Sequence, residues 1–309
     1  MTDIPTEHTP PEAPVADRYA FTRAVRSQRF GRILLDGPPG AGTTYTVLEM
    51  ATTIGTKVAV IDAQRGRCSI YADRFDFDTC TPPSQFTPDS LVTTLAHCAA
   101  QRYDTVVIAP LSPYWNGAGG VRELVDRAAQ RGAANSSAWR EVRPAVRRAE
   151  EAIFGYPGHL LATARNKLDY VVEGAEDGHK ARRIIGLAPV TLDDLEYQFD
   201  IVGTMDPAHT LVVSKAPNAD LSQAVEPRPG PAFAARVKEW LDQGQPLEPA
   251  HDLATEALVP SLTFDELGHL MNRVRARQAE GYPLLLSDGT AMLLGSYITR
   301  RGSDLRRER

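Results

Sequence analysis

The residues best suited to chemistry in this chain of 309 residues lie in one glycine-rich segment, residues 36–44, with the sequence DGPPGAGTT. Its spacing fits G-x-x-x-x-G-K-[ST], a loop in which backbone N–H groups surround phosphate oxygens. Glycine is needed there because the backbone takes conformations closed to other residues and lets phosphate approach closely. We therefore predict a phosphate-binding loop. The residues expected to hold nucleotide are Gly37, Pro38, Pro39, Gly40, Ala41, Gly42, Thr43, Thr44 and Tyr45.

One position of this loop departs from the pattern. Thr43 stands where the pattern has lysine, so a neutral hydroxyl replaces the ammonium that reaches the β- and γ-phosphates. Thr44 keeps the hydroxyl that can bind Mg²⁺, and we expect that binding to be weak. Taken alone, a glycine-rich turn without the lysine is equally compatible with a purely structural role.

Two further positions lack the acidic groups that nucleotide hydrolysis uses. The apolar strand expected at residues 104–109 ends in Ala109, where a carboxylate normally holds Mg²⁺ through water. The strand expected at residues 57–62 is followed by Gln64, which can orient a water molecule but cannot take its proton. With Thr43, Gln64 and Ala109 all altered, we expect no intact catalytic residue and lean against an enzyme.

The elements that must position these residues alternate between strand and helix. Apolar runs predict buried strands at residues 32–36, 57–62 and 104–109, and helical spacing predicts helices at 43–54 and 89–101. This alternation favours an α/β fold with a mostly parallel sheet and helices on both faces. Further patterns predict a hairpin-like stretch at 68–77, helices at 120–131, 137–154 and 232–241, and strands at 159–164, 168–172, 182–187, 200–205 and 210–214. The last two strands are expected to be antiparallel.

Composition divides the chain into four parts. Residues 1–17 are proline-rich with few apolar residues and are expected to be disordered, and residues 18–243 form the α/β domain. Residues 244–261 read as a linker, and residues 262–309 as a small α+β module of a helix and a hairpin. We expect the module to be separable, so that deleting it leaves the α/β domain folded. Its cluster Arg300, Arg301, Arg306, Arg307 and Arg309 reads as a solvated tail in preference to a nucleic-acid contact.

Charge and hydropathy exclude two classes of protein. Lys and Arg number 34 against 39 Asp and Glu, so the net charge of −5 excludes a strongly basic nucleic-acid-binding protein. No apolar run approaches the roughly 20 residues of a membrane-spanning helix. The first residues carry no signal-peptide pattern, so we expect a cytoplasmic location and no membrane partner.

Several motifs beyond the loop make a distinctive set: IDAQRG at 61–66, YWNGAGG at 114–120, HLLATARNKLDYVV at 159–172, LEYQFD at 195–200 and VSK at 213–215. Together with the loop, they resemble the phage-encoded AAA-type ATPases with a RecA-like core, some of which are single-strand annealing or recombination proteins. The resemblance runs from about residue 32 to residue 241. It implies a RecA-like P-loop NTPase fold, ATP and Mg²⁺ as ligands, ring or filament assembly, and work on single-stranded DNA.

The departures from this family fall on its charged groups. Besides Thr43, Gln64 and Ala109, Asn116 replaces a usual acidic residue and Pro217 replaces a basic residue near Lys215. The aromatic and glycine framework is kept. The leading hypothesis is therefore a pseudo-ATPase, a folded but catalytically inert binding or scaffolding subunit in phage or prophage DNA recombination or repair.

Two alternatives stay open. In the first, an active ATP-dependent single-strand DNA recombinase or annealing ATPase uses displaced groups. Arg165, Lys167 and Lys215 would then contact phosphate within or between subunits, and Asp36 or Asp62 would reach Mg²⁺, although Asp62 is equally compatible with a carboxylate satisfied by nearby backbone. In the second, the chain acts as an interaction module through its C-terminal tail. The partners implied by these readings are single-stranded DNA, further copies of the chain, or an active ATPase paralogue.

Overall fold

The computed structural model describes residues 23–82, 85–131, 135–174, 180–191 and 194–307, with the side chains of residues 135 and 167–188 excepted. The segment predicted to be disordered, 1–17, lies outside the described residues. Within them, no helix has both the length and the apolar character required to cross a membrane.

A nine-stranded sheet forms the centre of the molecule, in the order β3-β2-β4-β5-β1-β7-β8-β9, with β6 paired to β5 off this path. Its strands are β1 (Arg32–Gly37), β2 (Val58–Asp62), β3 (Asp78–Cys80), β4 (Thr105–Ala109), β5 (His159–Gly174), β6 (Lys180–Pro189), β7 (Ile201–Met205), β8 (Thr210–Lys215) and β9 (Val225–Pro227). The strands from β3 to β7 are parallel, and β8 and β9 are added antiparallel. The predicted mostly parallel α/β sheet with antiparallel additions is therefore confirmed.

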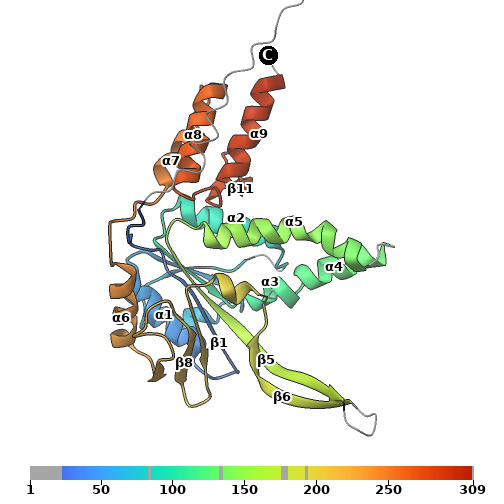
Figure 1. The fold of residues 1–309 in the computed structure, drawn as a ribbon, viewed down its shortest axis with the longest axis vertical. Helices are drawn as coiled ribbons and strands as arrows, with labels where there is room; N and C mark the ends of the chain where they lie inside the picture. The colour runs from blue at the N-terminus through green and yellow to red at the C-terminus, as the bar shows by residue number, and fades with distance from the viewer. Residues whose placement is uncertain (1–22, 83–84, 132–134, 175–179, 192–193, 308–309) are drawn as a thin grey trace, which may run out of the picture.

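Helices cover both faces of this sheet because successive strand residues point to opposite sides. On β1, Ile33 and Leu35 face α1 (Thr43–Ile54) and α6 (Pro231–Leu241), which lie side by side (Figure 1). Leu34 belongs to the cluster on the other face, with α2 (Pro88–Ala100) and α5 (Asn135–Phe154). The phosphate loop follows β1 and leads directly into α1.

Two extensions project from the main body (Figure 1). The short helix α3 (Ser112–Asn116) leads into α4 (Val121–Gln130), which packs on α5 around a small separate apolar cluster that includes Val125 and Val142. The second extension is the antiparallel ribbon of β5 and β6. The two strands predicted at 159–164 and 168–172 are thus one continuous strand.

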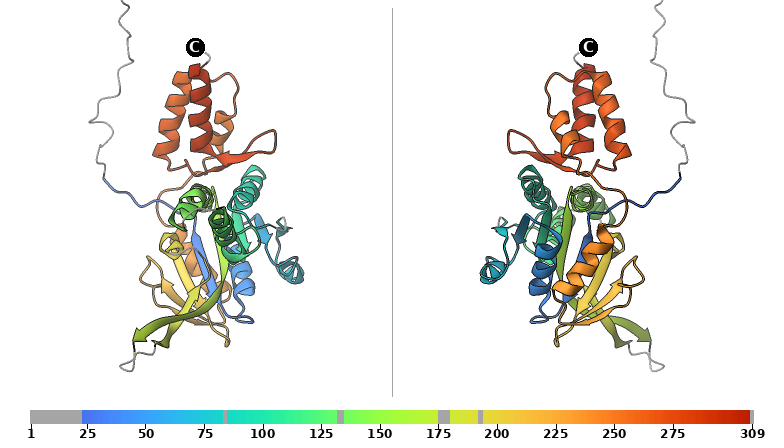
Figure 2. Two further views of the ribbon diagram at one scale, coloured as in Figure 1. Left: turned by 90° about the vertical axis from the view of Figure 1, so that its right-hand side faces the viewer. Right: turned by 90° about the vertical axis from the view of Figure 1, so that its left-hand side faces the viewer.

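The C-terminal residues form α7 (His251–Ala257), α8 (Phe264–Ala276), the hairpin of β10 (Pro283–Leu285) and β11 (Ala291–Leu293), and α9 (Leu294–Arg307). Figure 2 shows this group at one end of the molecule, next to α2 and α5. The predicted helix and hairpin are both present. The predicted linker, however, contains α7, and the sequence patterns missed α9.

The C-terminal group does not have a core of its own. Leu253, Leu284 and Leu294 belong to the same buried cluster as Leu91 and Leu95 of α2, and β10 packs along α2. This differs from the expectation of a tethered, separable module. The reason is that the last residues carry too few large apolar side chains to fill a core alone, so they complete the core of the sheet domain.

One local prediction was wrong. Residues 68–77 do not form a hairpin; Cys68–Tyr71 is a 3₁₀ helix, η2, after which β3 pairs in parallel with β2. The turn is closed by Asp62, which accepts a hydrogen bond from the Cys68 N–H at 2.8 Å. The Asp62 side chain thus holds the chain in a 3₁₀ turn after β2, and the hairpin predicted from the sequence pattern does not form.

Candidate phosphate-binding site

The segment between β1 and α1 is a tight, glycine-dependent turn. Ala41 N–H donates to the Pro38 carbonyl at 3.1 Å, and Gly40 and Gly42 have φ angles of 83° and 90°. Those positive φ values favour glycine. A Cβ on Gly37 would lie 2.9 Å from the Met205 carbonyl oxygen, so a side chain there would push β7 away. The conformation of this turn therefore depends on the glycines that the sequence pattern predicts for a phosphate-binding loop.

The first turn of α1 has no capping side chain. Gly42 is its N-cap residue, and the turn contains no acidic residue. By contrast, Thr87 caps α2 and Thr263 caps α8 through their side chains. The first N–H groups of a helix have no partner within the helix and attract anions. Thr43 and Thr44, both half-buried, open α1 at this point.

A residue that the sequence analysis missed lies against the loop. The Nδ1 atom of His209, in the turn between β7 and β8, lies 3.1 Å from the Ala41 carbonyl oxygen. The same ring packs close to Gly42. His209 is 168 residues from Ala41 in the chain, and no local pattern connects them. Only the placement of β7 beside β1 brings them together.

The strand end at which a carboxylate would normally hold Mg²⁺ is apolar and buried in this protein. Ala109 ends β4 with no exposed surface, on the sheet face that α1 covers. Its carbonyl oxygen accepts from the Ala63 N–H at 2.9 Å. No carboxylate is supplied here, and the described residues contain no group of three or more His, Cys, Asp or Glu side chains that could hold a metal.

Asp62 is occupied by its own loop. Its two carboxylate oxygens accept from the backbone N–H groups of Gln64 at 2.7 Å and Cys68 at 2.8 Å, and the residue is fully buried. Three strand spacings separate β2 from β1, which at about 4.8 Å each is about 14 Å. These contacts favour the structural role of Asp62 over Mg²⁺ binding, and Gln64 lies at the same distant strand end.

Asp36 is buried directly before the loop but on the other sheet face. It alternates with Leu35, so its carboxylate lies on the face opposite α1. There it accepts from the Thr204 hydroxyl at 3.2 Å and the Asn166 amide at 3.4 Å. Burial raises the pKa of Asp36 to about 6, against the lowering effect of these two hydrogen bonds. The side chain is thus held away from the first turn of α1.

The structure separates Arg165 from Lys215, two of the three basic residues expected to contact phosphate. Arg165 is exposed and pairs in register with Gly37, at the edge where the loop begins. The side chain of Lys167 lies outside the described residues. Lys215 donates to the carbonyl oxygens of Tyr197 at 2.5 Å and Glu196 at 3.4 Å, and it sits beside Val202, away from the loop edge. Of the two whose side chains the structure describes, Arg165 is the one placed next to the loop.

Tyr45 turns away from the loop. Its ring packs edge-on against Tyr71 at 5.9 Å and Phe75 at 5.2 Å between centroids, and the Arg74 guanidinium lies 5.1 Å from its centroid. The side chain of Tyr45 therefore anchors α1 to the β2–β3 connection. Of Tyr45, only the backbone is then available for the predicted binding of nucleotide.

The sequence pattern of a family described as AAA domain matches residues 29–232, which is more than half of the chain. This chain belongs to that AAA domain family. The loop, the sheet and the family together confirm the predicted α/β P-loop fold. The crystal structure of the RadB recombinase is similar at 15% identity with a TM-score of 0.38, over 64% of this chain and 86% of that one. None of the curated proteins matches the sequence.

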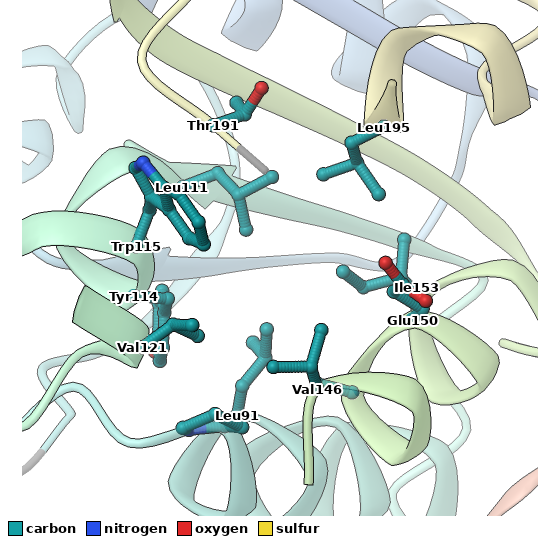
Figure 3. Close-up of a pocket in the computed structure, with 12 residues that line it drawn as sticks. Leu91, Leu111, Tyr114, Trp115, Val121, Val146, Glu150, Ile153, Thr191 and Leu195 are labelled. Carbon is teal, nitrogen blue, oxygen red and sulfur yellow. The ribbon is translucent and has the colours of Figure 1, made fainter. Parts of the chain in front are cut away.

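The AAA domain also contains a small apolar cavity of about 40 Å³ away from the phosphate loop. Figure 3 shows its walls, which come from α2, α3, the start of α4, α5, Thr191 and the 3₁₀ helix η3 (Leu195–Gln198). Trp115, Val146 and Leu195 line it, and Glu150 borders it with a pKa raised mainly by burial. No residue of the loop lines this cavity, so it is separate from the phosphate-binding site.

Proposed function

We propose that this AAA domain protein binds the phosphate groups of a nucleotide weakly and does not hydrolyse ATP. The loop turn and the uncapped start of α1 support anion binding, because backbone N–H groups bind phosphate without a lysine. The observation that carries the second half is the fate of the carboxylates: Ala109 offers none, Asp62 is bonded to its own loop, and Asp36 lies on the opposite face.

The residues of the loop match the phosphates of a nucleotide, but they match its Mg²⁺ only in part. The backbone of residues 37–44 would hold the phosphates, and the Thr44 hydroxyl would be the metal ligand from this chain. When bound, Mg²⁺ would offset charge between neighbouring phosphates. Because Ala109 provides no carboxylate opposite Thr44, we expect Mg²⁺ to add little to the affinity for the nucleotide.

We further propose a non-catalytic role in DNA recombination or repair, of phage or prophage origin. Its support is the resemblance of the motifs to phage RecA-like ATPases, together with a framework that is intact while the charged positions are replaced. In this role the protein would act as a binding or scaffolding subunit. Single-stranded DNA, further copies of the chain and an active ATPase paralogue are the proposed partners.

The test is ATP turnover, measured as phosphate release with Mg²⁺ present. Removal of one oriented charged group typically costs about 100-fold to 1000-fold in rate, so three missing groups should leave no turnover above background. Equilibrium binding of ATP and ADP, with and without Mg²⁺, is measured in parallel. Turnover that Thr44→Ala abolishes would overturn the pseudo-ATPase proposal, and tight binding that requires Mg²⁺ would show that another carboxylate serves the site.

A further inference from the structure

The apolar cavity lies where α3, α4 and α5 meet α2 and η3 (Figure 3). Its volume is about 40 Å³, and its lining includes Leu91, Val146 and Ile153. One water molecule needs about 10–15 Å³ of such volume, but it also needs polar partners, and a cavity lined by aliphatic side chains binds apolar groups instead. The described residues therefore leave room for the end of an aliphatic side chain that they do not supply.

The opening of this cavity is aromatic on one side and charged on the other. Trp115 and Glu150 are the partly exposed residues of the lining, and they lie on opposite sides of the cavity (Figure 3). Trp139, which is 37% exposed, packs against Trp115 with 5.9 Å between the ring centroids. A group that enters the cavity would thus also cover aromatic surface that is open to water.

Unpaired positive charge lies beside this opening. Arg143 and Arg147 are exposed, stand one helical turn apart on α5, and form no salt bridge with any described residue. Burial raises the pKa of Glu150, and both arginines oppose that rise, so both lie near the opening. By contrast, the adjacent Arg148 is paired with Asp89 at 2.9 Å. The two free guanidinium groups are therefore available to carboxylates from outside the chain.

We propose that the cavity and these two arginines dock an acidic peptide segment of a partner protein. A leucine or isoleucine of the segment fills the cavity, and its Asp or Glu side chains pair with Arg143 and Arg147. Glu150 accepts a hydrogen bond from a backbone N–H of the peptide. This inference goes beyond the proposed function, because no residue of the phosphate loop lines the cavity.

A nucleic acid fits the same surface less well. Its phosphates would pair with Arg143 and Arg147, but the polar edges of a base would have no hydrogen-bond partners among aliphatic side chains. A phosphodiester backbone also has no N–H group to donate to Glu150, and the carboxylate repels its negative charge. The pairing of an aliphatic cavity with free arginines thus favours a peptide.

Fluorescence anisotropy of labelled peptides, titrated with the whole protein, tests the proposal. The peptides are short runs of Asp and Glu around one central residue, which is either Leu or Ala. We expect the Leu peptide to bind about 10-fold tighter than the Ala peptide, because its additional apolar groups leave water in the cavity. The affinity of both peptides should fall with added salt, since salt screens exposed charges.

Variants separate the cavity from the charge. Ala149→Leu extends a side chain of the lining into the cavity, so the Leu peptide should bind it only as tightly as the Ala peptide does, with its salt dependence kept. Arg143→Gln combined with Arg147→Gln should weaken both peptides about 5-fold, the effect of two exposed ion pairs, and should reduce the salt dependence. Arg67→Gln, exposed next to η2 on the opposite face of the sheet, is the matched control and should change neither.

The proposal is overturned if neither peptide binds, if the Leu and Ala peptides bind equally, or if Ala149→Leu leaves the Leu peptide unaffected. A single-stranded oligothymidine is titrated in parallel. If it binds, loses affinity in the double arginine variant and is unaffected by Ala149→Leu, while the peptides do not bind, the surface serves nucleic acid instead. Thermal midpoints show whether each variant is folded, and Val146→Ile repeats the cavity test from a second position of the lining.

Discussion

At the scale of single residues, this protein has the backbone turn expected of a phosphate-binding loop, while its nearest carboxylates are engaged in structural hydrogen bonds. The loop turn depends on the positive φ values of Gly40 and Gly42. The carboxylates of Asp36 and Asp62 stand at the ends of β1 and β2, as strand-end acids do in nucleotide-binding sheets, but each is hydrogen-bonded to structural partners. A carboxylate at a strand end is therefore not enough to identify a metal ligand. Its hydrogen-bond partners determine whether it is available to a metal.

Asp36 gives a prediction about stability and pH. Its pKa of about 6 in the folded protein exceeds the value of about 3.9 of an exposed aspartate, so the folded protein binds this proton more tightly. The free energy of unfolding should accordingly fall as pH rises from about 4 to about 6, and stay reduced above that. Asp36→Asn removes the buried charge and should be more stable than the unmodified protein by about 1–3 kcal/mol at pH 8, with the difference gone near pH 4.

Urea unfolding at pH 4, 6 and 8 measures this difference. The matched control is Asp220→Asn, at an exposed position, which should change the free energy of unfolding little at any pH. An Asp36→Asn variant that is no more stable than the unmodified protein at pH 8 would mean that Thr204 and Asn166 stabilise the carboxylate more than burial opposes it.

At the scale of elements, the central question is how the C-terminal helices and hairpin relate to the sheet domain. Leu284 of β10 is 4% exposed and belongs to the cluster that includes Leu91 of α2. The family match ends at residue 232, so these elements lie beyond it and yet complete its core. A boundary drawn from family resemblance therefore does not coincide with the boundary of the packed core.

This shared core predicts that the C-terminal group cannot be removed without loss. Leu284→Asp buries a charge at the contact with α2 and should cost about 3 kcal/mol or more, which corresponds to a fall of roughly 5–10 °C in Tm. Deleting residues 262–309 should lower the Tm of the remainder further or make it insoluble. Leu258→Asp, at a half-open position of the same group with 39% exposure, should change the Tm little.

Thermal unfolding of the two point variants and the truncated chain decides the matter. A truncated chain with an unchanged Tm would restore the separable module that composition predicts. In that case the face of α2 that β10 covers would be exposed in the truncated chain, and the solubility of that chain would show whether another contact covers it.

At the scale of the whole molecule, we predict that self-association is independent of ATP. Lys215, a candidate for reaching the phosphates of a neighbouring subunit, has its ammonium bonded to the carbonyl end of η3. Releasing it would cost those hydrogen bonds. Light scattering coupled to size-exclusion chromatography, with and without ATP and Mg²⁺, should give the same mass. Oligomers that form only with ATP would contradict this, and Lys215→Ala would then show whether this lysine carries the effect.

The parts of the protein that depend on local spacing can be predicted from the amino-acid sequence. The strands β1, β2 and β4, the helix α1 and the loop between β1 and α1 follow from apolar periodicity and from glycines at turn positions. The loss of charge at Thr43, Gln64 and Ala109 is likewise visible in the sequence, because the glycine spacing identifies the first position and the ends of predicted strands identify the other two.

Only the tertiary structure decided which groups surround the loop. His209 meets Ala41 because β7 pairs with β1, and the order of strands in a sheet is set by long-range packing that no local pattern encodes. The same reason explains α7 and α9, whose short apolar faces pack against α8 and against each other within the shared buried cluster. The partners of Asp36 were equally a tertiary fact, since Thr204 and Asn166 are distant in the chain and folding alone places them beside its carboxylate.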